Sequence, residues 1–471
     1  MDSGKTRNVI LITVDCLRAD RVGSIAGGAL TPSIDKLARD SVVFRRAFAN
    51  GPGTNQSFPA ILTSTYFLMH GGMRLVQSCG TLAEVLFNNG FKTVAFHSNP
   101  FLSGSLGWSR GFNEFHDFLD VLKSPSAAVT RLSFTAKLAR FLNRATRVLS
   151  SKRIQSFLRR VYYEWSELEI PYVEGNQLNK YVIDWISSNK ETPFFLWMHY
   201  MDPHRPYVPP PYYSDYPCSR KEAFDFDLSV DPHLARGEVS EDELRRLKTL
   251  YAGEARYVDD CIGKLVEFLE AKGVMEDAIL VLSADHGEAF GEHKKFAHAY
   301  DMLYNEVLHV PLIMHGLPGC SSEVVGDYVQ LLDLAPTILE ALGIRKPDSF
   351  IGHSIMEVIQ ENRSRPIFSE SAKPDLIDVR YDTSKKVVSC ISGRWKLIVN
   401  ELWGTTELFN LEEDFLEKDN AIEDEREICA ELGSLIENHL LTHPRLGIGE
   451  VFEDTEKGRI MRRLRSLGYM Q

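Results

Sequence analysis

Apolar residues gather in short unbroken runs along the chain, at residues 9–14, 194–198 and 278–282. Runs of this length and composition predict strands that are buried on both faces of a sheet. Between them, residues 31–38 and 240–269 combine apolar positions with N-terminal capping residues, which predicts helices. A chain of 471 residues is longer than one core usually holds, so we expect one large α/β domain with a smaller companion.

Two of these predicted strands end in acidic residues. Asp15 follows the run at 9–14, and Asp285 with His286 comes shortly after the run at 278–282. Open α/β sheets bind their ligands just beyond the carboxyl ends of strands. Taken alone, either carboxylate would be interpreted as a helix cap or a turn residue. Two of them at one sheet edge are typical of a site for a divalent metal ion.

A glycine-containing loop predicts a further functional position. Residues 50–53 have the sequence Asn-Gly-Pro-Gly, and Thr54 follows them directly. Pro59 is suited to the first turn of a helix, so we expect a helix that begins at Pro59. A hydroxyl where a glycine loop meets a helix lies where backbone N–H groups and the helix dipole favour an anion.

Seven segments occur in an order found in one known family: residues 12–20, 31–38, 81–86, 202–207, 285–288, 333–337 and 393–398. The chain is similar to the sulfatase family of the alkaline phosphatase superfamily over nearly its whole length. This resemblance implies an α/β fold, a three-layer α/β/α sandwich around a mostly parallel sheet, with a small C-terminal α+β subdomain. We expect a catalytic domain over 1–345, followed over 346–471 by a subdomain with a short antiparallel sheet and a helix.

The resemblance also implies a nucleophile. In the family this residue lies in a segment written C-x-P-S-R, or T-x-P-S-H in members without the modified cysteine, nine residues before the Thr of a closing Thr-Gly. The closing pair here is Thr63-Ser64, which places Thr54 at the nucleophile position. Ser57 is the rival, but it leaves too few residues before the closing pair. Neither position holds a cysteine, so the formylglycine chemistry of sulfatases is not open to this chain.

The resemblance implies a metal site in which family members usually carry a second Asp after the first. This chain has Cys16 there, which leaves the coordination sphere open. We expect one divalent ion, and oxygen-rich ligation with one imidazole suits Ca²⁺, Mg²⁺, Mn²⁺ or Zn²⁺. The implied ligands are Asp15, Asp285, His286 and Thr54.

Two more histidines receive catalytic roles from the resemblance. His204 is expected to contact the ester oxygens or to protonate the leaving group. His298 is near the position where relatives carry a residue that clamps the anion. The candidates for substrate binding are Arg18, Ser57, His293 and Lys294.

Some of these polar residues have a structural interpretation as well. Arg18 is either structural or a residue that orients Asp15. His199, His309 and His315 lie in apolar strand contexts, which favours packing over catalysis.

Composition narrows the class of protein. The net charge of −12 argues against non-specific binding of nucleic acid. The seven cysteines are scattered without paired spacing, which suits a reducing compartment. The N-terminal apolar run is short and ends in Asp15, and no apolar stretch is long enough to form a transmembrane segment. We therefore expect a cytoplasmic protein; the sequence does not indicate an oligomeric state.

One segment departs from this acidic background. Residues 121–160 contain ten Lys or Arg and no Asp or Glu, and their apolar residues recur at helical spacing. We interpret residues 121–170 approximately as a basic helical insertion. It would cap the active site, contact a membrane surface or an anionic polymer, or simply pack on the main domain.

These features favour a metal-dependent hydrolase of sulfuric or phosphoric esters that acts through a covalent threonine intermediate. A single metal favours substrates with one negative charge, so we expect a phosphodiester or phosphonate monoester rather than a sulfate ester. The substrate would be an anionic ester, on a glycan or a lipid head group. The alternatives are a phosphotransferase acting on such a head group and a non-catalytic anion-binding member of the family.

Overall fold

The computed structural model describes residues 7–119, 170–189, 193–320, 322–361, 365–375 and 380–447. Its largest element is an eight-stranded sheet in which one of the eight strands, β9, runs antiparallel to its neighbours. The mostly parallel sheet that we expected is therefore confirmed. In spatial order the strands are β10 (Glu323–Gln330), β2 (Ser41–Phe48), β9 (His309–His315), β6 (Ala278–Ala284), β1 (Asn8–Val14), β5 (Phe194–Tyr200), β3 (Lys92–Phe96) and β4 (Glu114–His116).

Strand β1 lies in the middle of this sheet. All of its residues are buried, as are all residues of its neighbours β5 and β6. Both neighbours pair with β1 in parallel, so Ile10 lies between Leu196 and Leu280. Strands with partners on both sides and helices over both faces offer no solvent-facing positions, and this explains why their sequences are continuous apolar runs.

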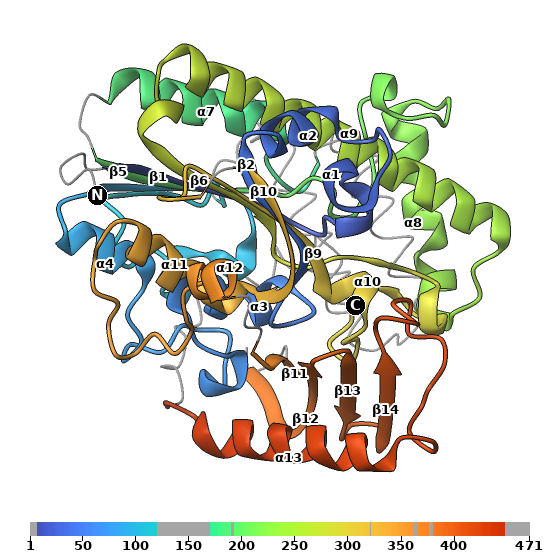
Figure 1. Ribbon diagram of the computed structural model, residues 1–471. Helices are drawn as coiled ribbons and strands as arrows, with labels where there is room; N and C mark the ends of the chain where they lie inside the picture. Colours follow the sequence, from blue (N-terminus) through green and yellow to red (C-terminus); the bar gives the residue numbers. More distant parts are fainter. Residues whose placement is uncertain are drawn as a thin grey trace, which may run out of the picture.

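Helices cover both faces of the sheet and complete a three-layer sandwich (Figure 1). Helices α2, α7 and α9 lie on one face, whereas α3, α4 and α11 lie on the other. The first group comprises α2 (Pro32–Ala38), α7 (Gly175–Ser188) and α9 (Glu241–Ala271). The second comprises α3 (Thr54–Thr63), α4 (Leu82–Asn88) and α11 (Leu334–Ala341).

The start of α9 confirms the predicted capping box. The Ser240 side chain accepts a hydrogen bond from the backbone N–H of Glu243, and the Glu243 carboxylate accepts one from the backbone N–H of Ser240. Thr81 and Glu84 make the same reciprocal pair at the start of α4. The start of α9 thus lies where the sequence predicts it, and α4, on the other face of the sheet, starts with the same motif.

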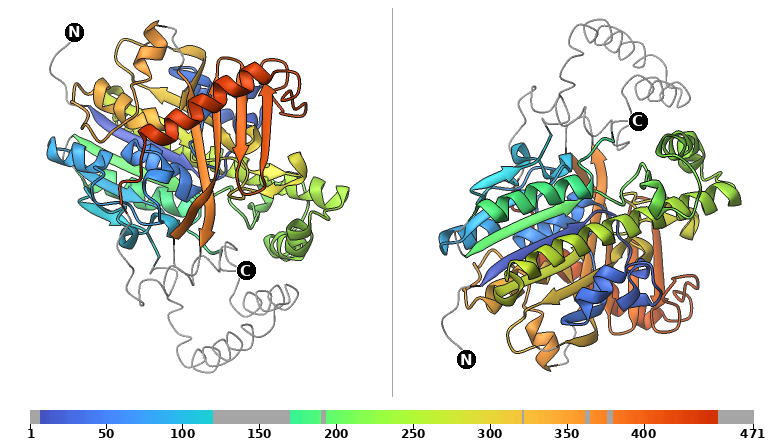
Figure 2. Two further views of the ribbon diagram at one scale, coloured as in Figure 1. Left: turned by 90° about the horizontal axis from the view of Figure 1, so that it is seen from below. Right: turned by 90° about the horizontal axis from the view of Figure 1, so that it is seen from above.

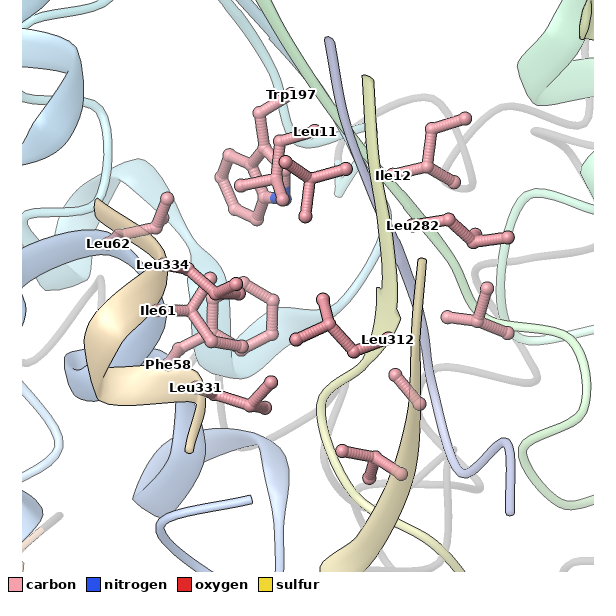
Figure 3. Packing of buried hydrophobic residues seen from close by; sticks show 14 of the residues in the cluster. Leu11, Ile12, Phe58, Ile61, Leu62, Trp197, Leu282, Leu312, Leu331 and Leu334 are labelled. Carbon is pink, nitrogen blue, oxygen red and sulfur yellow. The ribbon is translucent and has the colours of Figure 1, made fainter. Parts of the chain in front are cut away.

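Apolar residues of α3 attach this helix to the sheet (Figure 3). Leu11 and Ile12 of β1 point to opposite faces, and Phe58 of α3 lies on the same side as Leu11. The rings of Phe58 and Trp197 have centroids 5.4 Å apart. This packing fixes the position of α3, and hence of Thr54 at its first turn, relative to the ends of the central strands.

The C-terminal part of the chain forms a second, antiparallel sheet with one helix lying across it (Figure 2). The expected short antiparallel sheet and helix are confirmed: β12 and β13 form a hairpin across Gly393, and α13 is the helix. The expected boundary at residue 345 stays a prediction, since α12 (Met356–Glu361) still contacts β10 of the large sheet. The elements are β11 (Ile367–Asp375), β12 (Arg380–Ser392), β13 (Trp395–Asn400), β14 (Thr405–Asn410) and α13 (Arg426–Thr442).

The structure differs from the expected helices at two places. The helix predicted to begin at Pro59 begins instead at Thr54, because Pro59 is accommodated inside α3. The basic insertion expected at about 121–170 lies almost wholly outside the described residues. Elements that the sequence did not predict include α1 (Gly23–Ala26), α8 (Arg220–Arg236), α10 (Asn305–Leu308), β7 (Ala289–Phe290) and β8 (Phe296–Ala297).

The helices of the structure can be compared with the length and polarity that a membrane-spanning helix requires. Among the described residues, every helix is too short or too polar to cross a lipid bilayer.

Candidate active site

The carboxyl ends of four neighbouring strands bring polar side chains together at one edge of the sheet. Strands β6, β1, β5 and β3 are adjacent and parallel. Asp285 follows β6 and Asp15 follows β1, while His199 lies near the end of β5 and Asn99 follows β3. One ligand atom each of Asp15, His199 and Asp285 lies within 4.8 Å of the others.

Asp15 is the centre of this cluster and is fully buried. Its Oδ2 accepts a hydrogen bond from Asn99 Nδ2 at 2.9 Å and lies 3.3 Å from His199 Nε2. Its Oδ1 lies 3.5 Å from His286 Nε2. Burial acts to raise the pKa of Asp15, but the charges of His204 and His286 and the hydrogen bond with His199 outweigh it and hold the pKa well below its usual range. Asp15 is therefore a carboxylate.

Asp285 and His286 each have one potential metal-ligating atom that makes no hydrogen bond to the described residues. The Nδ1 of His286 hydrogen-bonds to the carbonyl oxygen of Gly287 at 2.8 Å, which leaves Nε2 facing the carboxylates of Asp15 and Asp285. Within the described residues, Asp285 Oδ2 and His286 Nε2 are buried and make no hydrogen bond. Buried polar atoms rarely stay unpaired, and a histidine held through its other nitrogen is typical of a metal ligand.

These observations fit a divalent cation. Burial raises the pKa of the Asp285 carboxyl, and the charge of Asp15 raises it further, because two buried carboxylates repel each other. A bound cation would make the ionised form of Asp285 favourable. Asp15, Asp285 and His286 would hold the ion, as the resemblance implied. This arrangement leaves the identity of the ion among oxygen-favouring and borderline metals.

Thr54 is the first residue of α3 and is 2% exposed. Its Oγ1 lies 3.3 Å from Asn99 Nδ2, the same group that donates to Asp15. Ser57 is arranged differently, because its hydroxyl donates to the backbone carbonyl of Asp285 at 2.6 Å. This geometry favours Thr54 as the reactive hydroxyl, whereas the Ser57 hydroxyl links α3 to the backbone at Asp285; the expected contact of Ser57 with substrate stays a prediction.

His204 and His298 lie next to each other, close to His286. The centroids of their rings are 5.4 Å apart, and the His298 centroid is 4.5 Å from that of His286. His298 Nδ1 lies 3.2 Å from Glu288 Oε2 and 3.6 Å from Cys16 Sγ. The structure therefore brings both predicted catalytic histidines to the cluster.

The two histidines differ in charge. Burial lowers the pKa of His204 to about 4, and its Nδ1 is hydrogen-bonded to the carbonyl oxygen of Arg205 at 2.6 Å. His204 is thus a neutral imidazole at neutral pH. Burial also acts to lower the pKa of His298, but the charge of Glu288 outweighs it and raises the pKa above its usual value, which favours the protonated imidazolium.

Cys16 occupies the place expected for a second acidic ligand. It has φ of 59°, is fully buried, and its Sγ donates to Asp15 Oδ1 at 3.1 Å. Burial and the carboxylates of Asp15 and Glu288 raise the pKa of its thiol well above the usual value. At neutral pH, Cys16 is therefore a protonated hydrogen-bond donor and not a nucleophile.

Two of the residues predicted to bind substrate, Arg18 and His293, are engaged elsewhere. The guanidinium of Arg18 binds the carboxylates of Asp20 and Glu292 and the carbonyl oxygen of Glu288, which favours its structural interpretation. The nitrogens of His293 contact Glu306 Oε1 at 2.9 Å and the carbonyl oxygen of Glu417 at 2.8 Å.

Lys294, another of these candidates, is exposed on the turn that follows His293. The structure thus gives Lys294 no contact with the cluster among the described residues, and the expected substrate contact stays a prediction.

Two site residues were missed. His199, interpreted as a packing residue, contacts Asp15 Oδ2, and its Nδ1 lies 3.0 Å from Thr13 Oγ1. Asn99 was not considered at all, although His97-Ser98-Asn99-Pro100 follows a predicted strand, the same signal that pointed to Asp15. By contrast, His309 stacks on Phe48, consistent with packing.

The remaining histidine of that group, His315, also lies away from the cluster. Its Nδ1 is 2.9 Å from the carbonyl oxygen of Asp40, at the opposite end of the sheet from the metal ligands. This location is consistent with a structural role.

The C-terminal sheet holds the loop that precedes Thr54. The backbone N–H of Glu370 in β11 donates to the carbonyl oxygen of Asn50 at 2.8 Å, and Asn50 Nδ2 donates to the carbonyl oxygen of Phe368 at 2.8 Å. On α3, Asn55 Nδ2 donates to the hydroxyl of Tyr381 in β12 at 2.9 Å. The loop before Thr54 and the first turn of α3 are therefore hydrogen-bonded to the C-terminal sheet.

Comparison with known proteins agrees with this arrangement. The sequence matches the family model described as Sulfatase over residues 7–344, and the model described as N-sulphoglucosamine sulphohydrolase, C-terminal, over residues 291–442. It is 24% identical over 444 residues to the multifunctional alkaline phosphatase superfamily protein PehA of Trinickia caryophylli, covering 84% of this chain and 85% of the relative. It is also 24% identical over 386 residues to an arylsulfatase of Clostridium perfringens, covering 76% of this chain and 79% of the relative.

Solved structures share the fold. The phosphonate monoester hydrolase of Agrobacterium radiobacter superposes with a TM-score of 0.67 at 20% identity, covering 93% of this chain and 96% of that one. BT4656, solved in complex with D-glucosamine-2-N,6-O-disulfate, superposes with a TM-score of 0.66 at 17% identity, covering 93% and 98%. The match of the sulfatase model to most of the chain, together with this fold, shows that the protein belongs to the sulfatase family of the alkaline phosphatase superfamily and is a hydrolase of sulfuric or phosphoric esters.

Proposed function

We propose that this protein cleaves a phosphodiester or a phosphonate monoester in preference to a sulfate ester, with Thr54 as the nucleophile. The observation that carries the proposal is the hydroxyl of Thr54 at the start of α3, where a formylglycine-dependent sulfatase needs a cysteine. A formylglycine hydrate expels sulfate by collapsing to an aldehyde, and a threonine has no such exit. Its covalent adduct must be cleared by attack of water, which suits phosphorus better than sulfur.

A threonine hydroxyl is a weak nucleophile at neutral pH. The divalent ion that Asp15, Asp285 and His286 would hold supplies positive charge that makes this hydroxyl more acidic. In the first step Thr54 Oγ1 forms a bond to phosphorus and gives its proton to His204, while the bond from phosphorus to the leaving oxygen breaks. The leaving oxygen takes a proton from His298.

The second step returns both histidines to their starting states. Water attacks phosphorus and gives a proton to His298, the bond from phosphorus to Thr54 Oγ1 breaks, and Oγ1 recovers a proton from His204. The opposite charge states of the two residues support these roles, since His204 starts neutral and His298 starts protonated. Asn99 Nδ2 would stabilise the Oγ1 oxygen while it carries negative charge.

The charge of the cluster supports a monoanionic substrate. The buried carboxylates are Asp15, Asp285 and Glu288. One divalent ion and the imidazolium of His298 balance these three charges, so no positive charge is left over for a dianionic phosphate monoester. Arg18, the nearest candidate for a further cation, is neutralised by Asp20 and Glu292.

The relatives support this substrate class without deciding it. They include a multifunctional superfamily protein and a phosphonate monoester hydrolase, but also an arylsulfatase and a protein bound to a sulfated glucosamine. All of these names are consistent with an anionic ester substrate. They do not distinguish a phosphorus ester from a sulfur ester, so that distinction rests on the identity of the nucleophile. Thr54 is the reason we favour phosphorus.

A substrate panel on the full-length protein tests the proposal. After chelation and return of one equivalent of Mn²⁺, Ca²⁺ or Zn²⁺, an aryl methyl phosphodiester and an aryl phosphonate should be hydrolysed faster than the aryl phosphate monoester and the aryl sulfate. Faster cleavage of the aryl sulfate would overturn the proposal. An increase in total turnover on addition of an alcohol acceptor would instead identify a phosphotransferase.

The nucleophile is tested with a matched pair of variants. Thr54→Ala should lose turnover, whereas Ser57→Ala, which removes a hydroxyl from the same helix, should be milder. Acid quenching of wild type during turnover, followed by mass spectrometry, should find the phosphoryl group on the peptide containing Thr54. An inactive Ser57→Ala beside an active Thr54→Ala would assign the wrong hydroxyl.

A further inference from the structure

The His298 loop, residues 291–304 between β7 and α10, is bonded to the C-terminal sheet. Trp403 lies in the turn between β13 and β14, and its Nε1 donates a hydrogen bond to Asp301 Oδ2 at 2.8 Å. At the end of the loop, the hydroxyl of Tyr304 donates to Glu407 Oε2 of β14 at 2.6 Å. Two side-chain bonds thus attach a loop of the proposed active site to strands that lie outside that site.

His293 attaches the same loop at two further points. Its Nδ1 lies 2.9 Å from the carboxylate of Glu306 in α10, and its Nε2 lies 2.8 Å from the carbonyl oxygen of Glu417, which follows β14. Burial acts to lower the pKa of His293, but the hydrogen bond and charge of Glu306 raise it to about 9, so both nitrogens carry protons at neutral pH and both donate. The ring also stacks on that of Tyr304, with centroids 3.8 Å apart. His293 is therefore held through both nitrogens and through one face of its ring.

The backbone of the His298 loop has conformations that residues with a side chain rarely adopt. His293, Lys294 and Ala297 have φ of 50°, 57° and 63°. The left-handed region is unfavourable for residues other than glycine, so such conformations persist only where the surrounding structure imposes them. The two bonds of His293 act at the first of these positions, and Ala297 immediately precedes His298. The direction in which His298 points therefore depends on contacts that His293 supplies.

Glu306 connects His293 to the partner of His298 as well. The carboxylate of Glu306 binds His293, and its carbonyl oxygen accepts a hydrogen bond from the backbone N–H of Glu288 at 3.0 Å. The carboxylate of Glu288 in turn lies 3.2 Å from His298 Nδ1. His293 is thus connected to His298 through the loop backbone and to Glu288 through Glu306, which are the two sides of one contact.

We propose that His293 is a positioning residue for His298, which it acts on through the His298 loop and Glu306 without touching the substrate. The inference rests on the proposed function, in which His298 gives a proton to the leaving oxygen. A proton donor works only within hydrogen-bond reach of its target, and a displacement of about 1 Å can cost roughly a hundredfold in rate. The C-terminal part of the chain therefore contributes to proton donation by holding the loop that carries the donor.

The leaving group distinguishes loss of proton donation from loss of folded enzyme. Phenoxide leaves poorly without a proton, whereas para-nitrophenoxide is a much more stable anion. With the metal-loaded full-length protein, His298→Gln should lower kcat/KM for methyl phenyl phosphate by roughly a hundredfold or more, and far less for methyl para-nitrophenyl phosphate. His293→Gln should show the same selectivity with a loss of roughly tenfold. If His298→Gln is selective but His293→Gln lowers both esters equally, or neither, the proposal is overturned.

His439→Gln is the matched control. His439 Nε2 lies 2.7 Å from Glu370 Oε1, and both side chains are buried, so this variant removes another His–Glu pair of the C-terminal part. Among the described residues, His439 makes no hydrogen bond or ring contact with the His298 loop. The variant should lower the unfolding temperature and leave the ratio of kcat/KM for the two esters unchanged. A change of that ratio as large as in His293→Gln would count against the proposal.

A milder variant covers the case in which His293→Gln does not fold. Tyr304→Phe keeps the ring that stacks on His293 and removes only the bond to Glu407. It should shift the ratio of the two esters in the same direction by a smaller factor. If His293→Gln does not fold, an unchanged ratio in Tyr304→Phe overturns the proposal.

A proton resonance tests the position of His298 without an activity assay. An imidazole N–H that is bonded to a buried carboxylate resonates far downfield of other N–H groups. In protein with isotope-labelled histidine, we expect such a signal from His298 Nδ1–H bonded to Glu288, and its loss in His298→Gln assigns it. The signal should be lost or broadened in His293→Gln and retained in His439→Gln. A signal that is unchanged in His293→Gln would refute the positioning role.

The two readouts separate this inference from the proposed function. If the signal is lost in His293→Gln but His298→Gln lowers both esters equally, His293 positions His298, and the role of His298 as proton donor fails. If His298→Gln lowers the phenyl ester selectively while His293→Gln changes neither the signal nor the ratio, the proposed function stands and the positioning role fails.

Discussion

Asn99 offers a direct test of whether residues from neighbouring strand ends cooperate in the proposed reaction. Its Nδ2 donates to Asp15 Oδ2 at 2.9 Å and lies 3.3 Å from Thr54 Oγ1, so one amide contacts both the proposed metal ligand and the proposed nucleophile. Its Oδ1 accepts a hydrogen bond from the backbone N–H of Phe101, which fixes the orientation of the amide. The change Asn99→Ala removes all three contacts and adds no new group.

The size of the effect follows from the charge of the partners. A hydrogen bond to a charged group contributes about 1.5–3 kcal/mol. The bond to Thr54 is long in the resting state and strengthens when Oγ1 becomes an anion, so its loss acts mainly on the transition state. At about 1.36 kcal/mol per factor of ten, kcat should fall by roughly tenfold to 150-fold, with KM nearly unchanged.

The assay is steady-state hydrolysis of an aryl phosphodiester at a metal occupancy verified by elemental analysis. Asn8→Ala is the matched control, because Asn8 is also buried and bonded, through its Oδ1 to the backbone N–H of Phe194, but lies at the opposite end of β1. It should lower the unfolding temperature without changing kcat. An Asn99→Ala enzyme whose kcat stays within about twofold of wild type at full occupancy would refute the reasoning.

Three more predictions concern the metal and the support of the site. Asp285→Ala should lose the bound divalent ion together with activity, since a site deprived of a charged ligand rarely keeps its metal; full occupancy by elemental analysis would contradict the ligand set. Burial acts to lower the pKa of His293, but the hydrogen bond and charge of Glu306 raise it to about 9. The stabilisation from this pair is therefore fully present below about pH 6.5 and is lost as the pH rises through about 9, and urea unfolding of His293→Gln should lack that dependence. Lys396 and Glu417 form a fully buried ion pair at 2.6 Å. Lys396→Met should cost about 3–5 kcal/mol in the free energy of unfolding, and adding Glu417→Leu should recover most of it; an unchanged single variant would count against burial of the pair.

The fold was largely predictable because the central strands are buried on both faces, which gives them a continuous apolar sequence. Residues 9–14 and 278–282 are apolar throughout because both faces of these strands are covered, and the acidic residue after each run lies at the ligand-binding edge. That is how the sequence indicated Asp15 and Asp285, which the structure brings together. The metal and catalytic roles of these residues stay predictions.

The missed residues depend on information that no single segment contains. His199 contacts Asp15 because β5 pairs with β1 in a register that places His199 beside Thr13. An apolar strand sequence does not specify its partner or its register, so His199 looked like a packing residue. Asn99 reaches Asp15 from β3, which is separated from β1 by β5 in the sheet. Its contribution is a consequence of strand order.

The start of α3 shows a different limit. Pro59 suggested a helix start because proline is well suited to a first turn. In the structure α3 starts at Thr54, and Phe58 and Ile61 pack against the sheet and α11 (Figure 3). Tertiary packing outweighs the local cost of an internal proline in this case.

The hydrogen bonds between β11 and the loop at Asn50 mean that the residues needed to position the proposed active site are not all in the large sheet and its helices. The residues that hold this loop come from a part of the chain more than 300 positions later, so the two parts cannot be exchanged between relatives as independent modules. A hybrid enzyme that joins this large domain to another C-terminal sheet would inherit every metal ligand and still present Thr54 at an altered angle. Successful recombination would have to carry residues 50–55 together with β11 and β12.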